Sequence, residues 1–162
     1  MKHVFILLSI SICLSCVENS SSGSSNVQRA VIEFKKEAEL SLFDKEGEVI
    51  KTIDIEIAET AYEQETGLMY REEMENHQGM LFTYKDERPR PSFYMKNTKI
   101  ALDLIYFDKD FKVVDFNLNA LPMDESLLSS KVPSQYVLEV VAGFVEEFNI
   151  QLGTHAQLKR LE

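Results

Sequence analysis

Alternating apolar and polar positions recur along the chain beyond about residue 39 and predict a β-rich domain. Residues 39–43 and 49–57 alternate on either side of the turn-forming residues 44–47, a pattern typical of a β-hairpin. In the second run the isoleucines fall on one face and Asp54 and Glu56 on the other, because side chains of a strand alternate between faces. We therefore expect both acids to lie on a solvated face.

Two short helices are predicted among these strands. Thr60 precedes Glu63 with the spacing of a capping box, which predicts a helix that runs towards Arg71. Gly67 weakens that helix because glycine has low helix propensity. Residues 144–148 carry a second apolar stripe at helical spacing.

Further apolar runs predict the remaining strands of the domain. They lie at residues 80–84, 92–98, 102–107, 112–118 and 136–141, with a short strand after Gly153. Many local hairpins with short helices between them favour an α+β fold, built on a small, largely antiparallel barrel or sheet.

The first fifteen residues have the layout of a secretory signal peptide. A basic start at Lys2 is followed by the apolar run 4–12, which is too short to span a bilayer. Ser15 immediately before Cys16 resembles the cleavage site of bacterial lipoproteins. This resemblance implies that residues 1–15 are removed and that Cys16 becomes a lipidated N-terminus.

Other interpretations of this segment remain open. Cys13 and Cys16 have the spacing of redox and zinc motifs, although no second ligand pair accompanies them. An ordinary signal peptide or a retained leader would also fit the pattern. Residues 16–26 form a Ser-rich tether in the lipoprotein interpretation, and Val17 then favours an outer membrane facing the periplasm, if the cell has two membranes.

Residues 27–162 are the right length for a single globular domain. The chain has 17 basic and 27 acidic residues and a formal net charge of −10. This balance disfavours nucleic acid as a partner, and it disfavours adhesion to anionic lipid through general positive charge. The membrane contact that we expect is therefore the lipid anchor.

Four separated blocks of sequence resemble an uncharacterised family, domain of unknown function 192 (DUF192). They are GLMYREEM from Gly67, GMLFTY from Gly79, the long block with FYMKNT from Arg88, and YVLEVVAGFVEEFNIQLGT from Tyr136. Together they cover about residues 48–158. The resemblance implies a compact β-rich domain that is often exported or lipid-anchored, with no settled activity.

The candidate site lies in and around the third block. Residues 85–99 contain five bases against two acids, on an otherwise acidic chain. The predicted ligand-binding residues are Arg90, Lys96, Asn97, Asp103 and Glu139. The arginine offers a planar fork for an anion, and the lysine and asparagine, expected in the centre of a strand, would orient the ligand. The carboxylates would fix the lysine.

A purely structural role for the same residues remains open. Lys96 would then pair with Asp103 or Glu139 inside the fold and only specify its packing. The acidic segment 59–75 and the basic segment 85–99 would face each other as ion pairs or be separately solvated.

Two further functions remain open besides a binding role. A hydrolase of envelope glycan or phosphoester would use Asp103 and Glu139 as an acid and base pair, but the chain has no nucleophile elbow, phosphate-cradling glycine loop or H-E-x-x-H helix. The methionines of residues 69–95, together with His77, suit Cu(I), yet methionine more often fills gaps in a core.

The sequence therefore predicts a non-catalytic binding or accessory module of the cell envelope. An anionic small molecule or an envelope component would be its partner. No cofactor and no metal ligand is assigned.

Overall fold

The computed structural model describes residues 32–90 and 93–162. The predicted signal peptide, Cys16 and the tether lie outside the described residues. Within the described ranges no helix is both long and apolar enough to cross a membrane.

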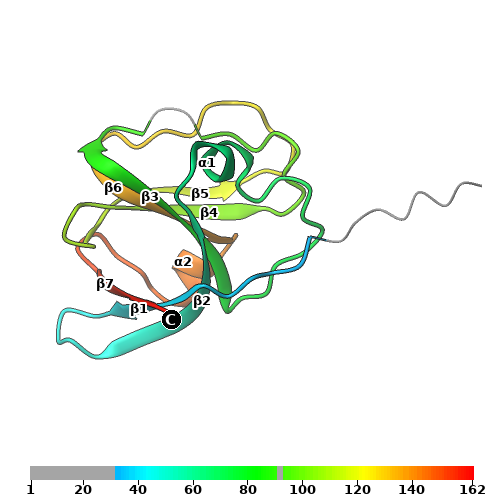
Figure 1. The fold of residues 1–162 in the computed structure, drawn as a ribbon. Helices are drawn as coiled ribbons and strands as arrows, with labels where there is room; N and C mark the ends of the chain where they lie inside the picture. The colour runs from blue at the N-terminus through cyan, green and yellow to red at the C-terminus, as the bar shows by residue number, and fades with distance from the viewer. Residues whose placement is uncertain (1–31, 91–92) are drawn as a thin grey trace, which may run out of the picture.

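In the described part of the chain, seven strands form one sheet (Figure 1). They are β1 (Ala38–Phe43), β2 (Val49–Ala58), β3 (Gln78–Arg88), β4 (Leu102–Phe107), β5 (Val113–Ala120), β6 (Ser134–Val141) and β7 (His155–Arg160). Their order across the sheet is β5-β4-β6-β3-β2-β1-β7. The pair β2 and β3 is parallel and the other neighbours are antiparallel. The predicted β-rich α+β fold with a largely antiparallel sheet is confirmed.

The first hairpin forms as predicted. Strands β1 and β2 pair with Ala38 opposite Ile55. In the turn, one carboxylate oxygen of Asp44 accepts hydrogen bonds from the backbone amides of Glu46 and Glu48, at 3.0 and 2.8 Å. Gly47 has a φ of +86°, a conformation that glycine adopts without steric cost. Local turn chemistry therefore fixes the register of this hairpin.

The sheet bends so that its two edge strands approach each other, but it is not closed. A single bridge joins Lys112, just before β5, to His155 at the start of β7. Three backbone hydrogen bonds support this contact, from the amides of Val113, Gly153 and Ala156 to the carbonyls of Thr154, Val113 and Phe111. Of the two predicted alternatives, a barrel or a sheet, the structure is therefore an open sheet whose edges meet only at this bridge.

Two apolar clusters cover opposite faces of the central strands. Along β4, Ile105 and Phe107 belong to the first cluster, whereas Leu104 and Tyr106 belong to the second. The short helix α2 (Phe144–Glu147) contributes to the first cluster and lies within the bend of the sheet (Figure 1). Because both faces of β4 are buried, a polar side chain on this strand needs a partner inside the fold.

The other helix, α1 (Ala61–Thr66), is shorter than predicted. Its capping box is complete, because the Thr60 hydroxyl accepts from the Glu63 amide at 3.2 Å and the Glu63 carboxylate accepts from the Thr60 amide at 2.8 Å. The helix ends at Gly67, where φ is +47°, rather than continuing to Arg71. The glycine that was expected to weaken this helix instead terminates it.

Candidate functional site

A pocket of about 600 Å³ lies between α1, the end of β3 and the segment that follows β3. We call it the Arg90 pocket. It is lined by Gln64, Glu65, Tyr84, Arg88, Pro89, Arg90, Phe93 and Tyr94. Its volume is in the range of small-molecule sites, and its aromatic walls with a few charged groups are typical of them. Two arginines and one glutamate give the lining a net positive charge on an acidic chain.

Arg90 is held rigidly although its side chain is charged. Only 4% of the residue is exposed. Its Nε donates to the carbonyl of Ser134 at 3.0 Å, and its Nη2 donates to the carbonyl of Asp86 and to the Asp86 carboxylate. The guanidinium lies 3.8 Å from the centre of the Tyr84 ring, a cation–π contact.

These contacts leave part of the guanidinium available. A guanidinium has five N–H donors, and the bonds to Ser134 and Asp86 use the donors of Nε and Nη2. Within the described residues, the donors of Nη1 have no hydrogen-bond partner. Arg90 therefore presents preoriented donors in a pocket, the arrangement that recognises a carboxylate or phosphate.

Aromatic side chains form one wall of this pocket. Phe93 packs edge-on against Phe82 and Tyr106, with ring centroids 5.1 and 6.2 Å apart. Burial raises the pKa of Tyr84 to about 12, and the nearby charge of Arg90 opposes this shift only in part. The Tyr84 phenol therefore stays protonated at neutral pH and can donate a hydrogen bond to a ligand.

Helix α1 forms the opposite wall. The Gln64 amide donates to the carbonyl of Thr83 at 2.8 Å and so ties the helix to β3. Glu65 also lines the pocket from this helix. Arg88, at the end of β3, has an exposed side chain whose Nε lies 3.4 Å from a carboxylate oxygen of Asp86. Arg88 is thus near the opening, whereas Arg90 is buried.

The structure does not place Lys96 and Asn97 as predicted. Among residues 93–98 of the predicted strand, Lys96 and Asn97 form a turn, and only Phe93 makes a strand-like bridge, to Leu128. Lys96 is exposed, and no ion pair of its side chain is found among the described residues. The expectation that Lys96 and Asn97 lie in the centre of a strand is therefore wrong.

Asn97 instead joins two loops that lie far apart in the sequence. Its backbone φ is +56°, a left-handed conformation that asparagine tolerates better than most residues. Its side-chain amide donates to the Tyr70 hydroxyl, and its backbone carbonyl accepts from the Tyr70 backbone amide, both at 2.8 Å. Lys99 beside it pairs with Glu72, so the basic and acidic segments do meet here.

Asp103 is occupied by the backbone rather than by Lys96. One carboxylate oxygen accepts from the Asn119 amide at 2.9 Å. The other accepts from the amides of Gly143 and Val145, at 3.0 and 3.1 Å. Asp103 is 1% exposed, and these bonds hold the β6–α2 turn and the end of β5 against β4. Its observed role is structural.

Glu139 lies on the opposite face of the sheet, away from Asp103. It pairs in register with Met80 on β3 and with Leu104 on β4, whereas Asp103 pairs with Val140. Burial raises the pKa of the Glu139 carboxyl to about 8. The predicted residues are therefore not gathered at one site, and the acid and base pair of the hydrolase hypothesis is not formed.

One buried ion pair was missed by the sequence analysis. Glu56, expected on a solvated face, is 6% exposed, and Arg71 is 9% exposed. The Arg71 Nη2 lies 2.5 Å from the Glu56 Oε2. Alternation placed Glu56 on the face away from the isoleucines, but it could not show that the segment after α1 covers that face. The only sequence signal was the position of Arg71 in the first family block.

The methionines considered for copper are largely part of the core. Met80 and Met95 are buried in the second apolar cluster, and Met74 packs against it. His77 is half exposed, with its Nδ1 3.4 Å from the Glu75 carboxylate. Among the described residues no cluster of three histidine, cysteine or acidic side chains could hold a metal ion. Copper binding through thioethers stays a prediction.

Comparison with known proteins identifies relatives of the whole domain. Residues 42–158 match the DUF192 family, described as "Uncharacterized ACR". A proposed transcription regulator from Sinorhizobium meliloti 1021 has a similar solved structure, with 31% identity, a TM-score of 0.72, and coverage of 78% of this chain and 97% of that chain. A protein of unknown function from Novosphingobium aromaticivorans DSM 12444 has 30% identity, a TM-score of 0.68, and coverage of 79% and 91%. No curated protein matches the chain.

Proposed function

The chain belongs to the DUF192 family of uncharacterised proteins, and we propose that it is a non-catalytic binding or accessory module of the cell envelope. Its ligand would be a small anionic molecule with an aromatic or apolar body, held in the Arg90 pocket. The observation that supports this proposal most directly concerns Arg90, a residue that is 4% exposed and lines this pocket. Its Nη1 donors have no hydrogen-bond partner among the described residues.

The surroundings of Arg90 support recognition of such a ligand. Ser134 and Asp86 fix the orientation of the guanidinium, so little conformational entropy remains to be lost on binding. The rings of Tyr84 and Phe93 provide apolar contact area beside it. Arg88 near the opening adds a second positive charge that would attract an anion before it enters.

A matched pair of probes tests this proposal. Benzoate and benzamide have nearly the same shape, but only benzoate carries the charge that Arg90 would recognise. We expect benzoate to bind the purified protein and to perturb the Tyr84 and Phe93 resonances in NMR spectra, with benzamide clearly weaker. Equal binding of the two probes, or perturbation confined to other aromatic residues, would contradict an anion site here.

Arginine variants locate the binding. Arg88→Gln should weaken benzoate binding several-fold without changing the fold, because its side chain is exposed. Arg160→Gln is the control, since Arg160 is also an exposed arginine paired with a glutamate, Glu59, but lies outside this pocket. Arg90→Gln should abolish binding, measured well below its own melting temperature because the buried arginine also supports the fold. Equal weakening of benzoate binding by Arg88→Gln and Arg160→Gln would contradict the assignment of the binding site to the Arg90 pocket.

We further propose that the protein is exported and anchored through a lipid on Cys16. The support is the signal-like segment before Cys16 and the Ser-rich stretch after it. The full-length protein should fractionate with membranes, and its N-terminal peptide should have the mass of an acylated cysteine. Cys16→Ala should abolish both results, whereas Cys13→Ala should leave them unchanged. Membrane association that survives Cys16→Ala would exclude this anchor.

A nucleic-acid partner is not part of this proposal, although one solved relative is named as a proposed transcription regulator. Binding to duplex DNA depends on cations that replace the counterions of the phosphates, and this chain has a formal net charge of −10. We expect no retardation of duplex DNA in gel-shift experiments even at low salt. Salt-dependent retardation would overturn this expectation.

A further inference from the structure

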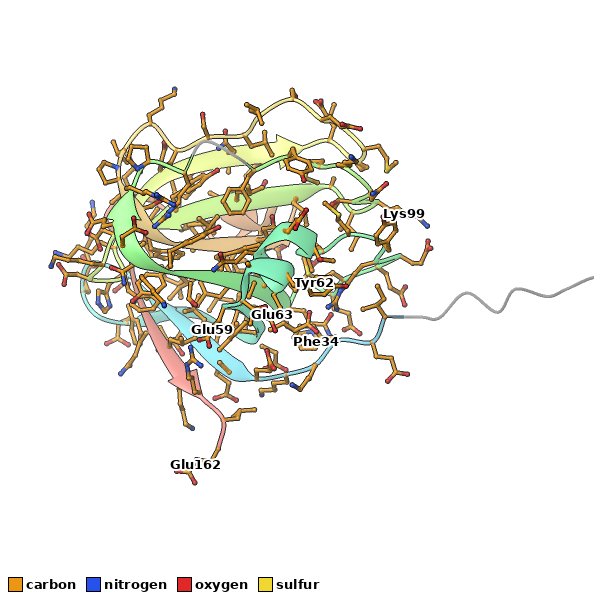
Figure 2. All side chains as sticks on the ribbon, turned by 45° about the horizontal axis from the view of Figure 1, so that its top comes forward. Phe34, Glu59, Tyr62, Glu63, Lys99 and Glu162 are labelled. Carbon is orange, nitrogen blue, oxygen red and sulfur yellow. The ribbon has the colours of Figure 1, made fainter. Side chains whose placement is uncertain are left out.

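A second pocket, of about 320 Å³, lies beside the same helix but shares no lining residue with the Arg90 pocket. We call it the Arg71 pocket. Figure 2 shows Tyr62 and Glu63 of α1 facing the N-terminal segment that carries Phe34, and both helix residues line this cavity. The buried pair Glu56 and Arg71 also lines it. It therefore combines an exposed rim with a buried charged floor.

The charged floor is incompletely satisfied. Arg71 Nε is buried and has no hydrogen-bond partner among the described residues, whereas Glu56 Oε2 is paired with Arg71 Nη2 at 2.5 Å. The other carboxylate oxygen of Glu56 accepts from the Lys35 amide at 2.7 Å. An unsatisfied buried donor is unfavourable. Arg71 Nε is too deeply buried for a ligand to reach, but the Nη1 donors of Arg71, which lines the cavity, also have no hydrogen-bond partner among the described residues. A ligand carboxylate would bind these Nη1 donors most strongly.

The charges of the lining decide between ligand classes. Two cations, Lys35 and Arg71, stand against three acids, Glu37, Glu56 and Glu63, which leaves a net charge of −1. A lone carboxylate would make this net charge −2, and a lone ammonium group would leave the Nη1 donors of Arg71 without an acceptor. A zwitterion supplies the carboxylate and keeps the net charge at −1.

The rim offers an acceptor for an ammonium group. Glu63 uses its Oε2 to accept from the amides of Glu59 and Thr60. Its Oε1 has no hydrogen-bond partner among the described residues, and Glu63 is exposed at the pocket lining. An ammonium group can therefore pair with Glu63 without disturbing the helix cap.

The remaining walls are apolar and adaptable. Met69, Met80 and Ile57 line the cavity beside the charged pair. Methionine side chains adjust to irregular shapes and so accommodate an aliphatic group. We propose that the Arg71 pocket binds a free α-amino acid with an apolar side chain, its carboxylate on Arg71 and its ammonium group on Glu63. This inference does not depend on the function proposed for the Arg90 pocket.

Three probes of similar size test the need for both charges. L-leucine has both, 4-methylpentanoate lacks the ammonium group, and 3-methylbutylamine lacks the carboxylate. Each is titrated into the purified full-length protein with labelled methionine methyl groups. We expect leucine to bind at least about tenfold more tightly than either analogue. It should shift the Met69 and Met80 signals but not that of Met123, which is exposed and lies outside the pocket.

A charge-neutral variant of the rim provides the sharper test. Glu63→Gln keeps the capping box, because glutamine serves at that position as well as glutamate, but removes the partner of the ammonium group. It should weaken leucine binding several-fold and leave 4-methylpentanoate unaffected. Glu65→Gln on the same helix is the control, since Glu65 lines the Arg90 pocket instead. It should change neither affinity.

A variant that fills the cavity checks the location. Met69→Phe should abolish leucine binding, with circular dichroism confirming that the protein is folded. The proposal is overturned if leucine leaves the Met69 and Met80 signals of the folded protein unchanged, or if either analogue binds as tightly as leucine. It is also overturned if the Glu63 and Glu65 variants weaken leucine equally.

Discussion

Asp103 and Glu139 lie on the neighbouring strands β4 and β6 but point to opposite faces of the sheet. Their register partners show this, because Asp103 lies opposite Val140 and Glu139 lies opposite Leu104. Asp103 faces the α2 side, where one carboxylate oxygen accepts from the amides of Gly143 and Val145 and the other accepts from the Asn119 amide. Glu139 faces the apolar cluster of Met80 and has no such donors among the described residues. The same type of residue thus has two different physical roles.

Replacement of Asp103 should test its role as a backbone anchor. Asp103→Asn leaves one acceptor oxygen where two now receive three amides, and directs an N–H₂ group towards backbone donors. We expect a loss of about 2–4 kcal/mol in the free energy of unfolding, measured with urea. Asp110→Asn, at an exposed position, should cost less than about 0.5 kcal/mol. Equal costs would contradict the anchoring role.

Glu139 should make the stability of the fold depend on pH. Its pKa is raised from 4.5 to about 8 by burial, so between these values the folded chain keeps a proton that the unfolded chain releases. Stability should therefore fall as pH rises through this window, by at most about 1.4 kcal/mol per pH unit, and level off above it.

The glutamine variant isolates this contribution. Glu139→Gln is neutral at every pH, so its stability relative to the native chain should increase steadily from pH 4.5 to 8, as measured by urea unfolding at several pH values. Glu125→Gln, at an exposed position, is the control and should follow the native curve. Parallel curves for native protein and Glu139→Gln would show that the carboxyl is ionised in the fold.

The buried pair of Glu56 and Arg71 should be costly to break. Arg71→Met leaves the Glu56 carboxylate buried without a countercharge and should lower the free energy of unfolding by about 3–5 kcal/mol. The double variant Glu56→Gln with Arg71→Met should recover part of this loss. Lys99→Met removes the exposed pair with Glu72 and should cost at most about 1 kcal/mol. A double variant less stable than the single one would contradict this account.

Gly79 should not tolerate a side chain. A Cβ there would lie 2.9 Å from the carbonyl oxygen of Glu139 and 3.1 Å from side-chain atoms of Leu138 and Val140, so backbone would have to move. We expect Gly79→Ala to cost about 1–3 kcal/mol in urea unfolding. Gly47→Ala meets no atom within 4 Å and should cost only about 1 kcal/mol, from its positive φ. If Gly79→Ala cost less stability than Gly47→Ala, the strands around Gly79 would be able to separate without cost.

Much of the secondary structure could be predicted because its signals are local. The β1–β2 hairpin depends on alternation around a turn, and the start of α1 depends on Thr60 and Glu63 three residues apart. The turn at Lys96 was mistaken for a strand, since Phe93, Tyr94 and Thr98 are residue types that are common in strands. Its conformation instead depends on loop contacts such as the bond from the Met95 amide to the Asp124 carbonyl. Such a distant partner leaves no mark in the local pattern.

The candidate site shows the same division. The sequence singled out Arg90 as a residue whose chemistry suits an anion, but it could not show that Tyr84 stacks on it or that α1 forms the opposite wall. Lys96 was grouped with it by proximity in sequence, although the turn leaves Lys96 exposed. Sequence distance was a poor guide because the fold places residues some twenty positions apart on facing walls.

The sequence by itself determined the elements of this protein, its family and the residues capable of chemistry, because periodicity, capping and side-chain type are properties of neighbouring positions. Only the tertiary structure decided the partners of those residues. Strand order and register sent Asp103 towards backbone amides and Glu139 into an apolar layer, and the segment after α1 buried Glu56 beneath Arg71. These outcomes depend on non-local packing, in which a shift of one residue along a strand exchanges the two faces.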